Sequence, residues 1–328
     1  MTESDTSSRR FRGTAAEESE STPMTEVTAL AQRVIDNVET VIVGKREAIE
    51  DALIVLLGRG HLLLEDVPGT GKTMLARSLA RSIDGDFKRI QFTPDLLPSD
   101  ITGVNVYNRR TDEFDFQHGP VFANVVLGDE INRAPPKTQS ALLEAMEESQ
   151  VTVDGETRPV PDPFLVIATQ NRIEPSRTYE LPVAEVDRFM KKVALGYPEE
   201  NEAAMLDRVV GEHPINAVEP VASLSDLKRA REQVAGVTVK QPVREYVAEI
   251  AGFTREHAQL GVSPRGSIAI LRASQARAAI NGRDYVIPDD VQQEAPTVLG
   301  HRVIIEGDHA GTSGHELIER AIETVPVP

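Results

Sequence analysis

The stretch that most restricts how this chain can fold is HLLLEDVPGTGKTMLARSLARSI, residues 61–83. Its apolar start has the length and leucine content of a short buried strand, and Leu75, Leu79 and Ile83 then recur at helical spacing. A loop containing proline and glycine separates the two. A strand, a glycine loop and a helix that opens on Lys-Thr are typical of a phosphate-binding loop. The alternative is a chance G-x-G-K-T in a surface loop, and the flanking strand and helix argue against it.

Each residue type in this loop has a physical role in binding a triphosphate. Glycine lets the backbone curl so that several N–H groups point at one anion. The helix start and the Lys72 ammonium add positive charge near the outer phosphates, and the Thr73 hydroxyl is placed to hold Mg²⁺. The full pattern G-x-x-x-x-G-K-[ST] has glycine where this chain has Asp66. The loop residues predicted to bind the nucleotide are Asp66, Val67, Pro68, Gly69, Thr70, Gly71, Lys72, Thr73 and Met74.

A second stretch with candidate catalytic residues is the apolar run NVVLGDE, residues 124–130, which ends in two carboxylates. Buried strands of parallel sheets are mostly apolar, so this ending is unusual. Asp129 could hold Mg²⁺ directly or through water, and Glu130 could orient and deprotonate an attacking water. Asn171 ends the next apolar run, where its amide could hold that water or the γ-phosphate. A solvated strand end for the carboxylates, and a turn or capping role for the asparagine, are the alternatives.

Composition limits the class of protein. The chain of 328 residues has no cysteine, which excludes disulfides and thiolate metal sites, and it has no apolar run of membrane-spanning length. Its start lacks the apolar core of a signal peptide, so we expect a cytoplasmic protein. The net charge of −17 disfavours nucleic acid and anionic lipid as partners. Because the lysines are few, we hypothesise a high-salt cytoplasm; an ordinary acidic cytosolic protein is the alternative.

The order of helix and strand patterns predicts an α/β domain followed by a helical one. Two short hairpins are predicted at 104–117 and 151–160, the second turning at Asp154-Gly155. Beyond Pro198 the strand patterns mostly stop. The helices predicted from there onwards are 201–212, 225–234, 243–259, 265–281, 288–299 and 316–324. The predicted organisation is a disordered tail at 1–24, a nucleotide-binding core at 25–197 and a helical lid at 198–328.

Several segments resemble MoxR-type AAA+ ATPases over nearly all of residues 26–328. They are LLLEDVPGTGKT, DITGVNVYNRRTDEFDFQHGPVFANVVLGDEINRAPPKTQSALLEAMEE, LVIATQN, LPVAEVDRFM and GVSPRG. In that family Asp66 is a common variant, whereas Gly128 stands where alanine is more usual. The resemblance implies a P-loop αβα sandwich with a five-stranded parallel sheet, a C-terminal helical lid, and hydrolysis of ATP with Mg²⁺.

The resemblance also implies roles for residues that spacing alone does not assign. Val43 and Gly44 match the adenine-contacting segment, and Asn171 matches sensor 1. Arg188 matches the arginine finger, which acts on the ATP of a neighbouring subunit, and Arg265 matches sensor 2, which reaches from the lid to the γ-phosphate. Without the family, an ion pair of Arg188 with the adjacent Glu185 or Asp187 would be the first interpretation. The 104–117 hairpin matches the insert that marks this AAA+ branch.

By the same resemblance the chain would form a hexameric ring and remodel client proteins or help insert a metal cofactor. Its expected partner is a protein with a von Willebrand A domain. A nucleic-acid motor is one competing hypothesis, and the acidic charge and the absence of tryptophan count against it. A nucleotide-gated scaffold with little turnover is another. The presence of Glu130, Asn171 and Arg188 counts against that hypothesis.

Overall fold

The computed structural model describes residues 23–171, 179–197, 214–305 and 312–328. The predicted tail, except for the residues that begin the first helix, and the predicted helix 201–212 lie outside the described residues. The strands and helices that surround the nucleotide-binding motifs follow the sequence prediction closely.

The central strands are β1 (Leu62–Glu65), β2 (Phe87–Gln91), β5 (Val125–Asp129), β8 (Leu165–Gln170) and β9 (Lys191–Val193). The hairpin strands are β3 (Gly103–Asn108), β4 (Glu113–His118), β6 (Gln150–Val153) and β7 (Glu156–Pro159). The helices near the sheet are α1 (Pro23–Glu39), α2 (Arg46–Leu57), α3 (Lys72–Ser82), α4 (Pro98–Thr102), α5 (Pro136–Glu148) and α6 (Val183–Val186), with the 3-10 turn η1 (Ile131–Arg133). The later helices are α8 (Leu224–Ala235), α9 (Gln241–His257), α10 (Pro264–Ile280), α11 (Pro288–Leu299) and α12 (Thr312–Thr324), with the 3-10 turns η3 (Pro214–Ala217) and η4 (Gly300–Arg302).

Within the described residues, the central sheet has five parallel strands in the order β2-β5-β8-β1-β9, which confirms the predicted fold class. The strands are apolar because both faces of the sheet are covered. Along β1 the side chains alternate: Leu62 and Leu64 pack into a core shared with α1, α2 and α3, whereas Leu63 packs into a second core shared with α5. The αβα sandwich therefore follows from the strand period of two.

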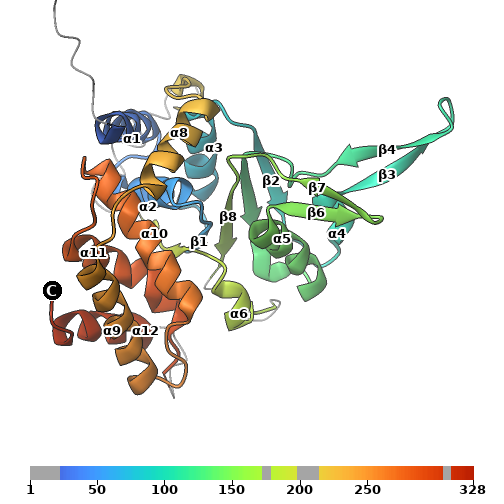
Figure 1. The fold of residues 1–328 in the computed structure, drawn as a ribbon. Helices are drawn as coiled ribbons and strands as arrows, with labels where there is room; N and C mark the ends of the chain where they lie inside the picture. The colour runs from blue at the N-terminus through green and yellow to red at the C-terminus, as the bar shows by residue number, and fades with distance from the viewer. Residues whose placement is uncertain (1–22, 172–178, 198–213, 306–311) are drawn as a thin grey trace, which may run out of the picture.

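Both predicted hairpins are present, and they extend away from the helical region (Figure 1). The turn of the β6–β7 hairpin places Asp154 and Gly155 at φ values of 51° and 84°, which an Asp-Gly pair tolerates. The β3–β4 hairpin exposes several large apolar side chains to solvent. These are Val104, Val106, Tyr107 and Phe114.

The later helices pack directly against the first helices of the chain. Helix α10 contacts α1 and α2, α8 contacts α1, and α11 contacts β9, so the helical region and one face of the sheet share a single hydrophobic core (Figure 1). In the helical region, Leu260 and Ile304 form an isolated antiparallel bridge. Among the described helices, none combines the length and apolar character needed to cross a bilayer.

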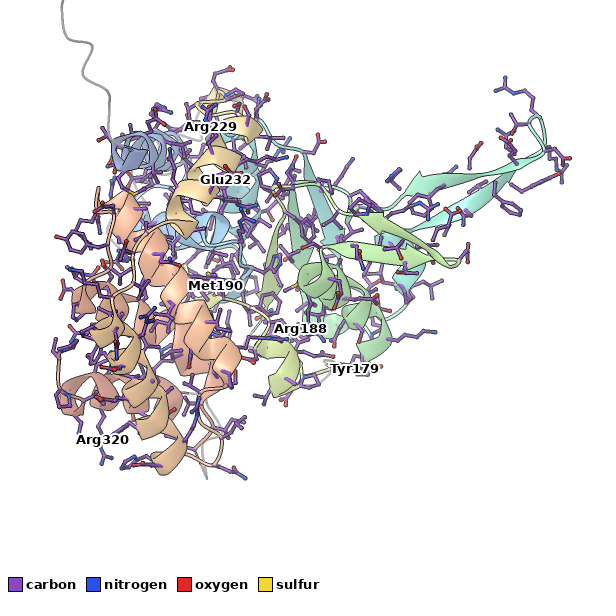
Figure 2. All side chains as sticks on the ribbon, viewed as in Figure 1. Tyr179, Arg188, Met190, Arg229, Glu232 and Arg320 are labelled. Atoms are coloured by element: carbon purple, nitrogen blue, oxygen red, sulfur yellow. The ribbon has the colours of Figure 1, made fainter. Side chains whose placement is uncertain are left out.

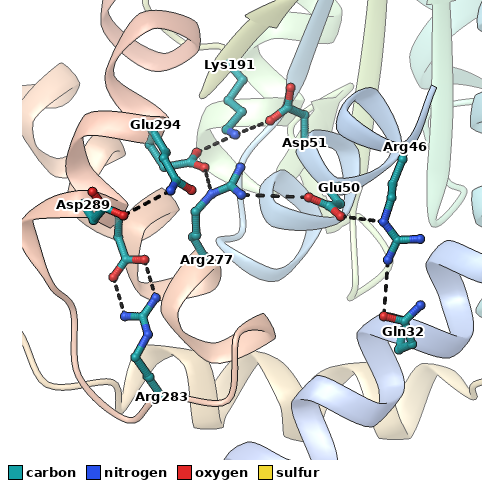
Figure 3. A network of polar contacts seen from close by, with 11 residues as sticks. Gln32, Arg46, Glu50, Asp51, Lys191, Arg277, Arg283, Asp289 and Glu294 are labelled. Carbon is teal, nitrogen blue, oxygen red and sulfur yellow. Dashed lines mark hydrogen bonds and ion pairs between the residues drawn. The ribbon is translucent and has the colours of Figure 1, made fainter. Parts of the chain in front are cut away.

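A buried ionic network joins this helical region to the sheet (Figure 3). Lys191, fully buried at the start of β9, lies 2.5 Å from Asp51 of α2 and also pairs with the fully buried Glu294 of α11. Arg277 of α10 pairs with the same Glu294. Burial raises the pKa of Asp51, and the nearby Lys191 opposes that rise. The network therefore fixes three helices to one strand.

Candidate active site

The loop between β1 and α3 has the backbone of an anion cradle. Gly69 and Gly71 have φ values of 86° and 92°, a left-handed conformation that other residues rarely adopt. A Cβ built on Gly69 would meet nothing within 4 Å, so the loop faces open space. Residues 68–74 line a cavity of about 390 Å³ beside it. Every predicted loop residue from Pro68 to Met74 therefore borders this cavity.

Lys72 lies at the mouth of the loop with its ammonium group folded back onto it. Its Nζ donates hydrogen bonds to the carbonyl oxygens of Asp66, at 3.2 Å, and Val67, at 2.8 Å. Burial lowers the pKa of Lys72, and the nearby carboxylates of Asp66, Asp129 and Glu130 oppose that shift. Its hydrogen-bond acceptors here are neutral carbonyl oxygens. An incoming phosphate would therefore offer this ammonium a stronger, charged partner.

The carboxylates of Asp129 and Glu130 border the same cavity. The parallel register aligns Asp129 with Gln91, so these strand ends meet at one edge of the sheet. Asp129 accepts a hydrogen bond from the Thr169 hydroxyl at 2.7 Å. Glu130 lies just past the strand at a φ of 56°, and its Oε2 accepts hydrogen bonds from Gln91 and Arg133, each at 2.8 Å. Both carboxylates are thus held in place at the cavity.

The remaining predicted residues of this site divide into two groups. Asn171 borders the cavity, next to Gln170 at the end of β8. Val43 and Gly44 do not border it, although the side chain of the preceding Ile42 lies 3.8 Å from a Cβ built on Gly71. An adenine contact for those two residues stays a prediction.

Asp66, in the position where the general pattern has glycine, does not line the cavity either. Its buried carboxylate accepts hydrogen bonds from the backbone N–H groups of Val67, at 2.7 Å, and of Leu195 and Gly196, at 2.9 Å each. Asp66 therefore links the start of the phosphate loop to the segment that follows β9. Its side chain has an anchoring position rather than a phosphate-facing one.

The predicted arginines lie in a second cavity, of about 340 Å³, and not in the first. Arg188 comes from the segment between α6 and β9 (Figure 2). Arg265 comes from the first turn of α10. Both pair with Glu147 in the last turn of α5; the Arg188 Nη2 is 3.2 Å from the Glu147 Oε2. Asp187, the neighbour expected to pair with Arg188, instead binds Arg302 at 2.7 Å.

The two cavities lie at opposite edges of the sheet. The first contains the residues that follow the carboxyl ends of β1, β5 and β8; the second contains Gly60 and His61, which precede β1, and Arg188, which precedes β9. A strand of four residues spans about 13 Å. Within one chain, Arg265 and Arg188 therefore lie at the edge opposite the phosphate loop, and their sensor 2 and finger roles stay predictions.

Three residues near these cavities were not predicted from the sequence. Arg89 of β2 borders the first cavity, and its Nε donates to Asp129 at 3.1 Å. Thr169 precedes Gln170 on β8 and holds both Asp129 and the backbone of Glu130. Glu147 joins the two arginines. Strand register could have indicated Arg89 and Thr169, because each lies on a strand that pairs with β5.

Comparison with known proteins agrees with this geometry. The family model described as "ATPase family associated with various cellular activities (AAA)" matches residues 61–191, and the "AAA lid domain" model matches residues 250–321. The uncharacterized protein YeaC of Bacillus subtilis is 50% identical over 91% of this chain and 95% of its own length. The chaperone MoxR1 of Mycobacterium tuberculosis is 43% identical over 90% of this chain and 82% of its own.

More distant relatives and a solved structure extend the match. Protein MoxR of Paracoccus denitrificans is 31% identical over 88% of this chain and 93% of its own length. A crystal structure of a Cytophaga hutchinsonii protein, described as a candidate ATPase, superposes with a TM-score of 0.86 at 39% identity, covering 93% of this chain and 97% of that one. The chain belongs to the MoxR family of AAA ATPases, which bind and hydrolyse ATP.

Proposed function

We propose that this chain is the subunit of a ring in which each ATP lies between two copies. One copy supplies the phosphate loop and the carboxylates at the carboxyl edge of its sheet, and the next copy supplies Arg188 and Arg265 from the amino edge of its own. The observation that carries the proposal is the placement of these two groups at opposite edges of one sheet. A hexamer, the usual ring of the family, is the proposed assembly.

In the first copy, the backbone N–H groups around Gly69 and Gly71 and the Lys72 ammonium bind the phosphates. Glu130 accepts the proton of the attacking water, since its carboxylate borders the cavity and is oriented by Gln91 and Arg133. Asn171 holds the water or the γ-phosphate by its amide. Arg89, which was not expected from the sequence, adds a guanidinium on the same side.

The donor set also fits Mg²⁺, the metal that ATP carries. Thr73 supplies a hydroxyl and Asp129 a carboxylate, and both border the same cavity. Hard oxygen ligands of this kind suit Mg²⁺ when triphosphate oxygens complete its coordination. The ion would neutralise charge that develops on the phosphates. The Thr169 hydroxyl keeps the Asp129 carboxylate oriented for this role.

The arginines of the next copy would complete the site. Phosphoryl transfer to water builds negative charge on the γ-oxygens, and an arginine finger is worth about 10³–10⁵ in rate. Arg188 takes the finger role and Arg265 the sensor 2 role. Because both lie in one cavity and share Glu147, they would reach the neighbouring triphosphate together.

We assign the output as chaperone-like remodelling of a client protein, or insertion of a metal cofactor, with a von Willebrand A domain protein as partner. A relative, MoxR1, is named a chaperone. The apolar side chains exposed on the β3–β4 hairpin offer a surface for an unfolded client segment. In this proposal residues 25–197 form the core and residues 198–328 the lid, and the network around Lys191 transmits motion between them.

A subunit-mixing experiment tests the shared site. Arg188→Ala rings should lose about 10³-fold in kcat, because each site lacks its finger. Glu130→Gln rings should also be inactive, because each site lacks its base. When the two inactive proteins are mixed and reassembled, phosphate release should reappear, since a Glu130→Gln subunit presents an intact Arg188 to a site with an intact Glu130. A mixture as inactive as its components, with mixed rings present by native mass spectrometry, would refute the proposal.

A further inference from the structure

The cavity that contains the two arginines is strongly basic in an otherwise acidic chain. Within the described residues its lining includes five arginines but only two carboxylates, those of Glu147 and Asp187. The Asp187 carboxylate has other partners: it accepts hydrogen bonds from the Arg302 Nε at 2.7 Å and from the Ser263 hydroxyl at 3.0 Å. Glu147 is therefore the carboxylate that faces Arg188 and Arg265.

The contact with Glu147 leaves most donors of both arginines available. The Arg188 Nη2 pairs with the Glu147 Oε2, and the Arg265 Nη2 pairs with the Glu147 Oε1. Neither Nη1 donates a hydrogen bond to the described part of the chain, and the Nε of Arg188 is buried without a partner there. A guanidinium has five N–H donors in a planar fork. Glu147 can thus bind both guanidiniums through their Nη2 atoms while their other N–H donors bind a second anion.

The contact with Glu147 also offsets the electrostatic repulsion between the two arginines. Arg188 and Arg265 come from distant parts of the chain and carry like charges into one cavity, with Arg59, Arg272 and Arg302 also lining it. Without a bridging anion, the like charges favour arrangements in which the two guanidiniums separate. Both side chains are partly exposed. A carboxylate that binds both guanidiniums holds them close together. At that separation both guanidiniums can bind oxygens of the same phosphate group.

The helix that carries Glu147 connects the two edges of the sheet. Helix α5 has 13 residues, so it spans about 20 Å. Its first turn follows η1, whose Arg133 holds Glu130, and its last turn carries Glu147. At that end, His61 bonds the Met146 carbonyl oxygen at 3.1 Å and so fixes the helix terminus to β1. The residue that holds the arginines is thereby anchored to the subunit's own site.

We propose that Glu147 is a positioning residue that presents Arg188 and Arg265 as a pair to the γ-phosphate bound by the neighbouring subunit. This inference rests on the proposed function, because it requires that the arginines act between subunits. It adds a residue that neither the phosphate loop motif nor the finger motif contains. Glu147 touches no substrate atom in this scheme and acts only through the two guanidiniums.

The test is the kinetics of Glu147→Ala rings, with Glu148→Ala as the matched control. Glu148 is the next residue on α5, is exposed, and has no ionic partner in the described residues. Misplacing reacting groups by an ångström costs about 10²-fold in rate, and we expect a loss of that order in kcat for Glu147→Ala. The KM for ATP should stay near wild type, since the phosphate loop is untouched. Glu148→Ala should behave as wild type.

Mixing with Glu130→Gln subunits separates positioning from structural damage. An intact Glu147 in a Glu130→Gln subunit should restore turnover at the site of a Glu147→Ala neighbour, whereas damage within the variant's own site would persist. Glu147→Gln, which keeps the packing but not the charge, should show a smaller loss. It serves as the variant if Glu147→Ala does not assemble.

Three outcomes would overturn the inference: wild-type kcat in both Glu147 variants, a raised kcat, or a loss that mixing does not restore while it does restore Arg188→Ala. Failure of mixing to restore Arg188→Ala would instead refute the proposed function itself. The two failures are therefore distinguishable in the same assay.

Discussion

The carboxyl edge and the amino edge of the central sheet are built in different ways. At the carboxyl edge, a single stretch between β1 and α3 supplies most of the lining, and Asp129 and Glu130 join it through strand register. At the amino edge, the partners are far apart in sequence; Arg265 and Glu147 are separated by 118 positions. The first edge is specified locally, and the second exists only when the helical region is packed on the sheet.

This difference has a functional consequence. Under the proposed function, neither edge contains all the groups that hydrolysis of ATP requires: the carboxyl edge has the phosphate cradle and the base, and the amino edge has the paired arginines. A subunit with both edges exposed can give one half of a site to each of two neighbours. A fold with unequal edges therefore favours a ring, in which the carboxyl edge of each subunit meets the amino edge of the next.

The largest expected effect is at the carboxyl edge. Lys72→Ala should abolish ATP turnover and weaken ATP binding severely, because it removes the cavity-lining ammonium that the proposed function assigns to the phosphates. Phosphate release and equilibrium binding of a fluorescent ATP analogue measure the two effects. Lys88→Ala on the exposed side of β2 is the control. Normal kinetics in Lys72→Ala would show that this cavity is not the nucleotide site.

Most of this edge could be predicted from the sequence because its determinants are local. The glycines, Lys72 and Thr73 lie within one loop and helix start, and their spacing alone fixes their geometry. Three of the five strands, β1, β5 and β8, were likewise visible as apolar runs, and the sheet confirms them. The hairpin at 151–160 was predictable for the same reason, since Asp154-Gly155 determines its turn.

The next largest effect is a loss of stability when the buried ionic network around Lys191, at the amino edge, is broken. Lys191→Ala should destabilise the protein by about 3–5 kcal/mol, because it leaves the carboxylates of Asp51 and Glu294 buried without their ammonium partner. Urea unfolding measures the change in free energy. Lys192→Ala, which removes a partly exposed pair with Glu65, should cost far less. Equal losses in the two variants would mean that the buried network does not hold the helical region to the sheet.

A smaller effect at the amino edge depends on pH. Burial lowers the pKa of His61 to about 4. Its Nδ1 accepts from the Val166 N–H at 3.0 Å, so only Nε2 carries a proton, and a second proton would break that bond. The unfolded chain, with a pKa of 6.5, binds more protons between pH 6.5 and 4, so stability falls as pH falls through that range. The expected loss is about 3 kcal/mol.

His61→Gln isolates this contribution, because glutamine does not titrate. Unfolding midpoints of the variant should fall less between pH 6.5 and 4.5 than those of the wild type. Other groups titrate in both proteins, and buried His301 also has a lowered pKa, so the difference between the two curves is the measured quantity. Parallel curves would contradict the assignment of His61 as a buried neutral histidine.

The amino edge was less predictable for physical reasons. Spacing cannot show that Glu147, Arg188 and Arg265 meet, since their contact depends on how α10 packs against the end of α5. The local interpretation of Arg188, a pair with Glu185 or Asp187, was wrong because Asp187 is held by the buried Arg302. Asp66 was predictable as part of the loop but not as its anchor, since its partners Leu195 and Gly196 are distant in sequence.

The most direct test of the central claim, that one subunit holds two unmatched halves of the site, is ATPase activity per subunit as a function of protein concentration. Sedimentation velocity on the same samples gives the assembly state. We predict negligible turnover where the protein is monomeric, although ATP still binds, and a rise to a plateau as rings form. Full activity per subunit in a monomeric sample would contradict the account, because one chain would then contain every group that hydrolysis needs.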